Sequence, residues 1–123
     1  MKENYKILYS EIVNTLSKFS TDKKLNVGAL LLKDGRIIAT GYNGQPSGQA
    51  HIPVLYDGHD ISTIHAEENC LLFAAKNGIA TKYCEIFVTH FPCVHCMKSL
   101  FQAGICKIYY LNDYRNEDNF YKK

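Results

Sequence analysis

The sequence predicts an α/β protein, specifically a three-layer α/β/α sandwich around a mixed sheet. Stretches in which apolar residues recur at helical spacing alternate with short apolar runs, in the order helix, strand, strand, helix, strand, helix, strand. An Asp34-Gly35 turn between the first two apolar runs indicates an antiparallel hairpin. The last strand, helix and strand imply a right-handed crossover with parallel pairing, so the sheet is expected to be mixed.

The first half of the chain is expected to hold one helix and one hairpin. Helical spacing of apolar residues predicts an amphipathic helix over Lys2–Ser20. Val27–Leu32 is an apolar run typical of a buried strand, and Ile37–Tyr42 returns as its antiparallel partner after the turn Lys33–Arg36. Asn43–Thr63 is a long loop rich in Gly, Pro, Asp and His, and loops of this length in compact domains are usually functional.

The second half is expected to alternate helices and strands. The pattern predicts a helix over His65–Asn77, a third strand over Glu85–His90, a helix over Cys93–Ala103 and a fourth strand over Lys107–Leu111. The polar and aromatic tail Asn112–Lys123 has no pattern that assigns it to an element.

Composition restricts the class of protein. The 123 residues fit a single domain over residues 1–123, and the 46% hydrophobic and 21% charged fractions are ordinary for a globular protein. A net charge of +2 is too small to indicate a stable nucleic-acid partner. No apolar run is long enough to span a membrane, and the chain does not start with a secretion signal, so a cytoplasmic location is expected.

Two short motifs carry the chemistry, His65-Ala66-Glu67 and Pro92-Cys93-Val94-His95-Cys96. One His and two Cys are the ligands of a catalytic zinc that keeps its fourth position open for water. His65 and Cys93 each fall at a predicted helix N-terminus, which favours a thiolate, and Cys93 and Cys96 lie on one helical turn. Glu67 is the natural proton carrier. Five cysteines, two of them in this CxxC, favour metal binding over a disulfide framework.

A structural zinc or a redox CxxC pair would explain the cysteines alone. A structural site needs a fourth protein ligand, which His51 or His59 in the long loop is available to supply. His95 lies between the two cysteines on one turn and is expected to point away from the metal. Glu67 and the helix-start positions fit an open catalytic site better than either alternative.

The motif pair resembles the cytidine deaminase superfamily, which implies a cytidine deaminase-like fold. Three segments are similar to its deoxycytidylate (dCMP) deaminase branch: Gly41–Gly48 (GYNGQPSG), Val27–Ala29 with Lys24 before it, and Cys84–Arg115. The last segment is also very similar to the deaminase-like protein of the late-competence operon of Gram-positive bacteria. By this resemblance, His65, Cys93 and Cys96 bind one catalytic Zn²⁺ per subunit, and Glu67 shuttles protons.

The same resemblance implies five contacts with the substrate. Asn43 hydrogen-bonds the sugar, and the backbone N–H of Ala66 holds the pyrimidine O2. Lys24, Tyr114 and Arg115 are the candidates for the 5′-phosphate, for which Arg is suited by its bidentate geometry. Each of these three is equally well explained as a solvated side chain in a polar segment.

The implied reaction is the hydrolysis of dCMP to dUMP and ammonia, which supplies the precursor of dTMP. Proteins of this branch are commonly hexamers regulated by dCTP and dTTP. A homo-oligomer (hexamer or dimer), these effectors, and Mg²⁺ bound with a nucleotide effector are therefore also implied. The loop between Gly48 and His65 lacks the cysteines that many relatives carry, so a second, structural zinc is not expected.

Two other kinds of function stay open. One is a deaminase of another base or nucleotide, such as tRNA adenosine, cytosine, guanine or dCTP. The tRNA enzymes share both motifs, but they favour a more basic surface. The other is a competence-associated accessory protein that retains the zinc fold. Such a protein has no need of Glu67, so we expect catalysis.

Overall fold

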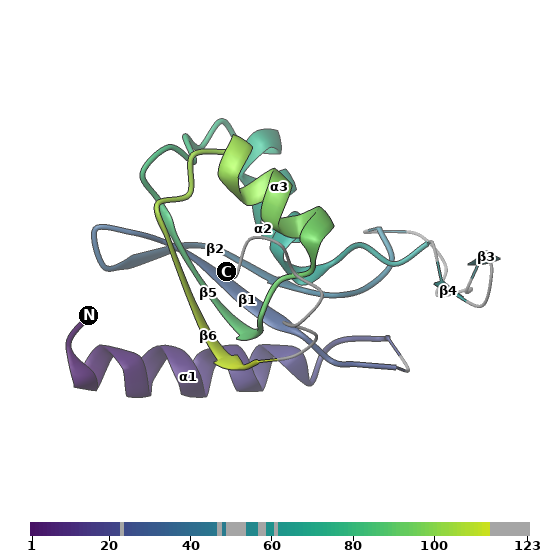
Figure 1. Cartoon of the computed structure of the whole chain (residues 1–123), viewed down its shortest axis with the longest axis horizontal. Coiled ribbons are helices and arrows are strands. Elements are labelled where there is room, and N and C mark those ends of the chain that lie inside the picture. Colours follow the sequence, from purple (N-terminus) through teal and green to yellow (C-terminus); the bar gives the residue numbers. More distant parts are fainter. Residues whose placement is uncertain (23, 47, 49–53, 57–58, 61, 114–123) are drawn as a thin grey trace.

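A four-stranded sheet forms the centre of the computed structural model, which describes residues 1–22, 24–46, 48, 54–56, 59–60 and 62–113 (Figure 1). The strands, in spatial order, are β2 (Arg36–Tyr42), β1 (Gly28–Lys33), β5 (Glu85–His90) and β6 (Lys107–Asn112). β1 runs antiparallel to both β2 and β5, whereas β6 is parallel to β5. The predicted mixed sheet is therefore confirmed.

Helices of the described chain cover both faces of this sheet. α1 (Glu3–Ser17) lies against one face, and α2 (Ala66–Lys76) and α3 (Val94–Gln102) lie on the other (Figure 1). The three-layer α/β/α arrangement is thus as predicted. No helix in the described ranges is both long and apolar enough to cross a membrane.

The alternation of side chains along β1 builds a separate core on each face. Leu30 and Leu32 pack with Val13 of α1 and with Phe87 of β5. Leu31 belongs to the opposite core, together with residues of α2 and α3. Because both faces are covered, β1 reads in the sequence as one continuous apolar run instead of an alternating pattern.

The Asp34-Gly35 turn joins β1 and β2 as predicted. Asp34 has a φ of 51° and Gly35 a φ of 77°, and a type I′ turn needs positive values at both central positions. The Tyr9 hydroxyl donates a hydrogen bond to the Gly35 carbonyl, so α1 is fixed to the turn as well as to the sheet.

The predicted crossover is also present, because β5 leads through α3 into the parallel strand β6 with Glu85 opposite Lys107. Gly104 follows α3 with a φ of 87°, a value that side chains with a Cβ rarely adopt. A Cβ there would lie 3.0 Å from the Cα of Lys82. Glycine therefore permits both the turn and the close approach of the chain.

The boundaries of the predicted elements lie within one residue of the prediction, except for the end of α1. α1 ends at Ser17 and not at Ser20, because Phe19 and Ser20 donate to Leu16 and Ser17 at 3.0 and 3.1 Å, a tighter turn than the α-helix has. β6 continues to Asn112. Most of the unassigned tail lies outside the described residues.

The described parts of the long segment after β2 include strands that were not predicted. The segment contains a short antiparallel hairpin of β3 (Leu55–Tyr56) and β4 (His59–Asp60). Gly44 and Ile64 also exchange backbone hydrogen bonds of 3.0 and 2.7 Å at its base. This bridge brings the two ends of the segment together and places Asn43 near the start of α2.

Candidate metal centre

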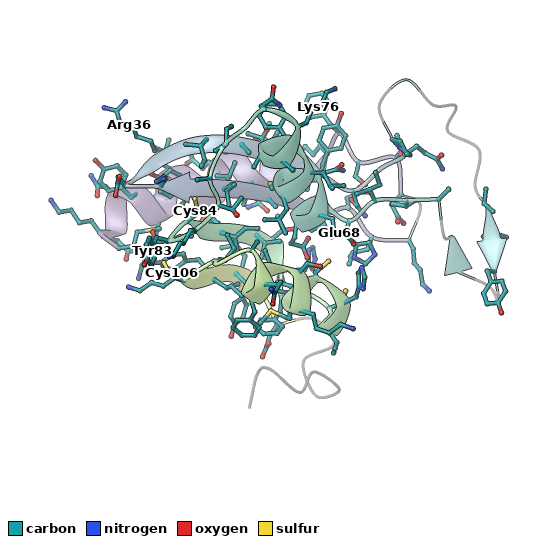
Figure 2. The ribbon with its side chains drawn as sticks, turned by 90° about the horizontal axis from the view of Figure 1, so that it is seen from above. Arg36, Glu68, Lys76, Tyr83, Cys84 and Cys106 are labelled. Atoms are coloured by element: carbon teal, nitrogen blue, oxygen red, sulfur yellow. The ribbon has the colours of Figure 1, made fainter. Side chains whose placement is uncertain are left out.

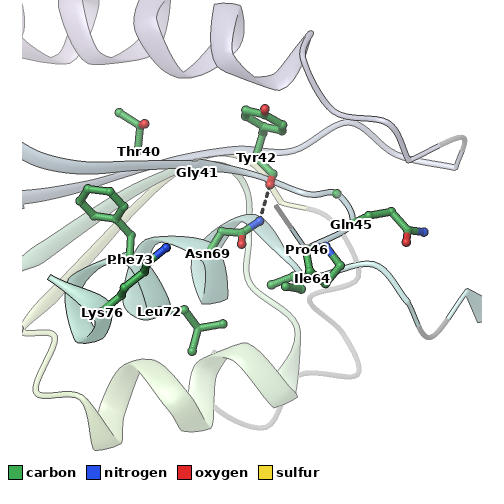
Figure 3. A pocket seen from close by; sticks show the side chains of 11 residues that line it. Thr40, Gly41, Tyr42, Gln45, Pro46, Ile64, Asn69, Leu72, Phe73 and Lys76 are labelled. Carbon is green, nitrogen blue, oxygen red and sulfur yellow. Dashed lines mark hydrogen bonds between the residues drawn. The ribbon is translucent and has the colours of Figure 1, made fainter. Parts of the chain in front are cut away.

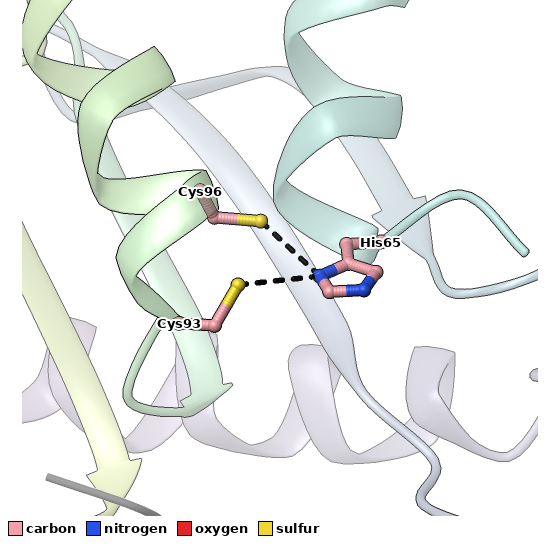
Figure 4. A group of neighbouring side chains, drawn as sticks. All are labelled: His65, Cys93 and Cys96. Atoms are coloured by element: carbon pink, nitrogen blue, oxygen red, sulfur yellow. Dashed lines mark hydrogen bonds between the residues drawn. The ribbon is translucent and has the colours of Figure 1, made fainter. Parts of the chain in front are cut away.

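The first turns of α2 and α3 meet and bring the three predicted zinc ligands together (Figure 4). His65 is the N-cap of α2, Cys93 is the N-cap of α3, and Cys96 lies in the first turn of α3. His65 Nδ1 is 3.6 Å from Cys93 Sγ and 3.3 Å from Cys96 Sγ. His65 and Cys93 reach the surface, whereas Cys96 is buried.

This donor set fits zinc. The ligand atoms of His65, Cys93 and Cys96 all lie within 4.8 Å of one another, as three ligands of one ion require. An imidazole and two sulfur atoms are borderline and soft ligands, which suit Zn²⁺ and not Mg²⁺. Within the described ranges, no fourth His, Cys, Asp or Glu joins this group, which leaves one tetrahedral position for water or substrate.

Electrostatics in the metal-free cluster already favour a thiolate. Hydrogen bonding with Cys96 lowers the pKa of Cys93 to about 3. The pKa of His65 is raised to about 9 by its hydrogen bond with Cys93, against the opposing effect of burial. Cys93 is therefore held as a thiolate, the form that binds metal, whereas the raised pKa values of Cys96 and His65 mean that both lose a proton when a cation binds.

Glu67 lies beside this cluster as the second residue of α2. Its side chain is buried, with only 4% of the residue exposed. Burial raises the pKa of Glu67 to about 7, partly opposed by a hydrogen bond with its own backbone and by the charge of His65. A carboxyl group that titrates near neutrality can both accept and return a proton, which suits general acid–base chemistry.

Asn43 has a clear structural role. Its Oδ1 accepts a 2.9 Å hydrogen bond from the Val27 N–H, and its Nδ2 donates a 2.7 Å hydrogen bond to the Leu25 carbonyl. The residue is 6% exposed. Asn43 therefore fixes the segment that enters β1, and its contact with a sugar stays a prediction.

Of the three phosphate candidates, only Lys24 lies within the described residues. Lys24 is exposed, in a turn where Asp22 Oδ1 accepts hydrogen bonds from the N–H groups of Lys24 and Leu25 at 2.7 and 3.2 Å. Tyr114 and Arg115 lie outside the described residues. Ala66 is buried at the start of α2, next to His65.

The histidines considered for a structural site do not complete one in the described chain. His51 lies outside the described residues, and His59 belongs to β4. His95 Nε2 lies 3.4 Å from Glu68 Oε1, so His95 meets a carboxylate of α2 instead of joining the ligand group. This agrees with the expectation that His95 points away from the metal.

Sequence reasoning missed the role of Thr89. Thr89 is 1% exposed, and its Oγ1 accepts a 3.1 Å hydrogen bond from the Gly28 N–H and lies 2.8 Å from His90 Nδ1. Asn112 Nδ2 donates to the Thr89 carbonyl at 2.8 Å. The feature of the sequence that could have indicated this role is a hydroxyl residue next to the apolar residues of β5. These bonds tie β1, β5 and β6 together on the chain just before Cys93.

A cavity lies between α2 and β2 (Figure 3). It has a volume of about 330 Å³, and its lining includes Tyr42, Phe73 and Lys76. Asn69 crosses it to donate a 2.7 Å hydrogen bond to the Tyr42 carbonyl. No residue of the metal cluster lines this cavity, so it is separate from the site described above.

Comparisons with known proteins agree with this geometry. The family model "Cytidine and deoxycytidylate deaminase zinc-binding region" matches residues 2–112. ComE operon protein 2 of Bacillus subtilis (strain 168) is 46% identical over 100 residues, which cover 78% of this chain and 53% of that protein. The chain thus spans about half the length of this relative.

Deoxycytidylate deaminases are also similar in sequence and structure. The enzyme of Enterobacteria phage T4 is 32% identical in an alignment 146 positions long. The alignment covers 85% of this chain and 76% of that protein. The crystal structure of the dCMP deaminase from the cyanophage S-TIM5, in complex with dCMP and dUMP, matches with a TM-score of 0.86 and 40% identity, over 96% of this chain and 88% of that chain. The matched residues include both motifs, and the chain belongs to the cytidine and deoxycytidylate deaminase family.

Proposed function

We propose that the protein is a zinc-dependent deaminase that hydrolyses dCMP to dUMP and ammonia. The observation that carries the proposal is the position of Glu67, a buried carboxyl group two residues from His65 at an open set of three ligands. A structural zinc site has no use for such a group. The deoxycytidylate deaminases among the relatives support dCMP as the substrate.

His65, Cys93 and Cys96 would hold the ion, which when bound lowers the pKa of water toward neutrality and so supplies a nucleophile for C4. Glu67 accepts the proton that this water releases and gives it to ring N3. Once the C4–O bond has formed, Glu67 takes the remaining proton from the new C4 hydroxyl and delivers it to the amino group. The C4–N bond then breaks, ammonia leaves, and the C4 carbonyl of dUMP forms. Burial is the largest of the effects that raise the pKa of Glu67 to about 7, a value that suits both the acceptance and the return of a proton.

The remaining substrate contacts belong to the same proposal. The Ala66 N–H would hold the pyrimidine O2, Asn43 the sugar, and Lys24, Tyr114 and Arg115 the 5′-phosphate. Asn43 supports the role of Lys24 indirectly, because it fixes the backbone at Leu25 and Val27, directly after Lys24. Assembly into a homo-oligomer and regulation by dCTP and dTTP are proposed on the family resemblance.

The test is a deaminase assay on zinc-loaded protein with dCMP, deoxycytidine, dCTP and cytosine, each with and without added dCTP as an effector. Ammonia release and the loss of cytosine absorbance are recorded. Turnover of dCMP far above that of deoxycytidine is expected, because dCMP offers a 5′-phosphate to the proposed contacts and deoxycytidine does not. Equal turnover of the two would overturn the phosphate site and favour a nucleoside deaminase.

A second candidate is an accessory protein that keeps the zinc fold without this reaction. It is favoured by the 46% identity to ComE operon protein 2, a relative whose name specifies an operon and no reaction. Failure of a folded, zinc-loaded sample to deaminate any of the tested compounds, or tRNA adenosine and guanine, would select this candidate.

A further inference from the structure

One carboxylate oxygen of α2 contacts two residues in the first turn of α3. Glu68 Oε1 lies 3.8 Å from the Cys96 Sγ and 3.4 Å from the His95 Nε2. Figure 2 labels Glu68 on α2, at the side of that helix that faces α3. The residue thus connects a metal-ligand sulfur to an imidazole that is not itself a ligand.

The helices that carry the ligands come from distant parts of the chain. α2 supplies His65 at its start, and α3 supplies Cys93 and Cys96. The site therefore works only if the two N-termini stay at a fixed distance from one another. Glu68 and His95 lie on the two sides of this junction, and each is within one residue of Glu67 or Cys96.

The pair is unsuited to a large contribution to overall stability. The Glu68 side chain is 29% exposed and that of His95 is 67% exposed, and ion pairs at such positions contribute little to folding. Its position beside a ligand gives it a different use. Side chains that contact metal ligands orient them, and their loss commonly weakens metal binding by about 10- to 100-fold.

We propose that Glu68 and His95 act as a positioning pair that holds Cys96 and the start of α3 in place against α2, and so slows the loss of the metal. The contact between Glu68 and His95 joins α2 to the first turn of α3, and so holds the backbone that carries Cys96 in place. It does not need the proton of the Cys96 thiol, which is absent when the sulfur binds zinc. Neither residue is a catalytic residue, since both act through Cys96. The inference rests on the proposed zinc site, but it does not depend on which substrate the site accepts.

The test measures the rate at which zinc passes from the intact protein to a chromogenic chelator, with no nucleotide present. Glu68→Gln keeps the shape of the side chain and removes its charge, and His95→Ala removes the imidazole. Each is expected to accelerate zinc release by about 10-fold. The double variant is expected to release zinc no faster than either single variant, because both changes break the same contact.

Two further variants separate positioning from general damage. His95→Gln retains an N–H donor of similar reach and should restore a release rate near that of the wild type. Glu11→Gln changes an exposed carboxylate of α1, far from the site, and should leave the rate unchanged. In the Co²⁺-loaded protein, the visible d–d bands should shift in Glu68→Gln and His95→Ala, while the thiolate-to-metal absorption persists.

Several outcomes would overturn the proposal that Glu68 and His95 act as a positioning pair. Unchanged release in Glu68→Gln or His95→Ala would do so, as would fully additive effects in the double variant. Complete loss of zinc in Glu68→Gln with normal release in His95→Ala would make Glu68 a ligand instead. If Glu68→Gln does not fold, Glu68→Asp, which shortens the reach of the carboxylate, replaces it. A wild-type protein that binds no zinc would overturn the proposed function itself, whereas absence of dCMP turnover leaves the release rates fully interpretable.

Discussion

The carbonyl oxygen of Ala66 lies 2.5 Å from the point that a Cβ atom on Gly41 would occupy. Gly41 belongs to β2, and Ala66 is the first residue of α2. Real Cβ atoms are essentially never found closer than 3.0 Å to another heavy atom of this kind. The start of α2, and with it His65, is therefore seated against the sheet at a distance that only glycine permits.

Gly41→Ala should consequently damage the metal centre. The new methyl group must displace the backbone at the start of α2, and such overpacking typically costs about 1–3 kcal/mol of stability. We expect a lower melting temperature together with at least about 10-fold weaker zinc binding, since a ligand-bearing helix has moved. Thermal unfolding and a competitive zinc titration measure the two effects.

Gly28→Ala is the matched control for this prediction. A Cβ on Gly28 would contact the Val13 carbonyl of α1, on the opposite face of the sheet. It should lower stability to a similar degree and leave zinc affinity in the folded protein close to that of the wild type. Equal losses of zinc affinity in both variants would contradict the special position of Gly41.

Glu67→Gln should separate metal binding from turnover. The amide has the same shape as the carboxyl group but cannot accept and return protons, and general acid–base groups typically contribute about 10²- to 10⁴-fold to the rate. Zinc content and melting temperature are expected to equal those of the wild type, while ammonia release falls by that factor. Glu11→Gln should retain full activity. Wild-type turnover in Glu67→Gln would remove Glu67 from the mechanism.

Asn43→Ala should destabilise the protein even without substrate. The change leaves the Val27 N–H and the Leu25 carbonyl without their partner, and a lost hydrogen bond at a buried site typically costs about 1–3 kcal/mol. Urea unfolding of the nucleotide-free protein measures the difference. Wild-type stability combined with a raised KM would instead mean that Asn43 serves the substrate alone.

Stability should decline in alkali because of Tyr9. Burial, followed by the charges of Tyr5 and Glu85, raises the pKa of Tyr9 above the ordinary value of about 10 for a tyrosine. A folded-state pKa above the unfolded one favours the neutral phenol in the folded protein. The contribution of Tyr9 to the free energy of unfolding is therefore complete below about pH 10, and it is lost as the pH rises through the folded-state pKa. Urea unfolding at a series of pH values should show this decline.

Tyr9→Phe provides the comparison for that titration. This variant should be less stable at neutral pH, because it lacks the hydrogen bond to the Gly35 carbonyl. The stability of Tyr9→Phe should also fall less steeply between about pH 10 and 12, since the phenol of residue 9 is no longer there to ionise. Parallel pH profiles for the two proteins would assign the alkaline decline to other groups, of which Tyr109 is one with a raised pKa.

Removal of the metal should abolish activity and lower the melting temperature. A ligand that binds only the folded state stabilises it in proportion to its occupancy, so the chelated protein should unfold at a lower temperature. Zn²⁺ should restore both properties, whereas Mg²⁺ should restore neither, because it prefers oxygen ligands. Full activity after exhaustive dialysis against a chelator would contradict the metal requirement.

The fold was predictable because its signals are local. The apolar run of β1, the Asp34-Gly35 turn and the helical spacing of α2 and α3 each fix one element from neighbouring residues alone. The ligand group was predictable for a similar reason, since each motif marks a helix start. What brings the two starts together is the sheet, whose order follows from the hairpin and the crossover.

Other features depend on contacts that no local pattern encodes. Asn43 bonds to the backbone of Val27 and Leu25, which lie 16 and 18 positions before it in the chain. The resemblance of the motif implied a contact with the sugar, and it gave no sign of these backbone contacts. The contact of His95 with Glu68 depends on how α2 and α3 meet. The hairpin of β3 and β4 was missed because strands of two residues carry too few side chains to show an alternation.

His65 and Cys93 are 28 positions apart, and β5 lies between them in the chain. Before α2 and α3 dock on the sheet, only Cys93 and Cys96 are near one another, and two sulfur atoms capture zinc less firmly than the complete set. We therefore expect the ion to be acquired late, once long-range strand pairing has formed, and we expect chains with mispaired strands to bind little metal. The zinc-to-protein ratio of a refolded preparation thus counts the molecules that have reached the native topology.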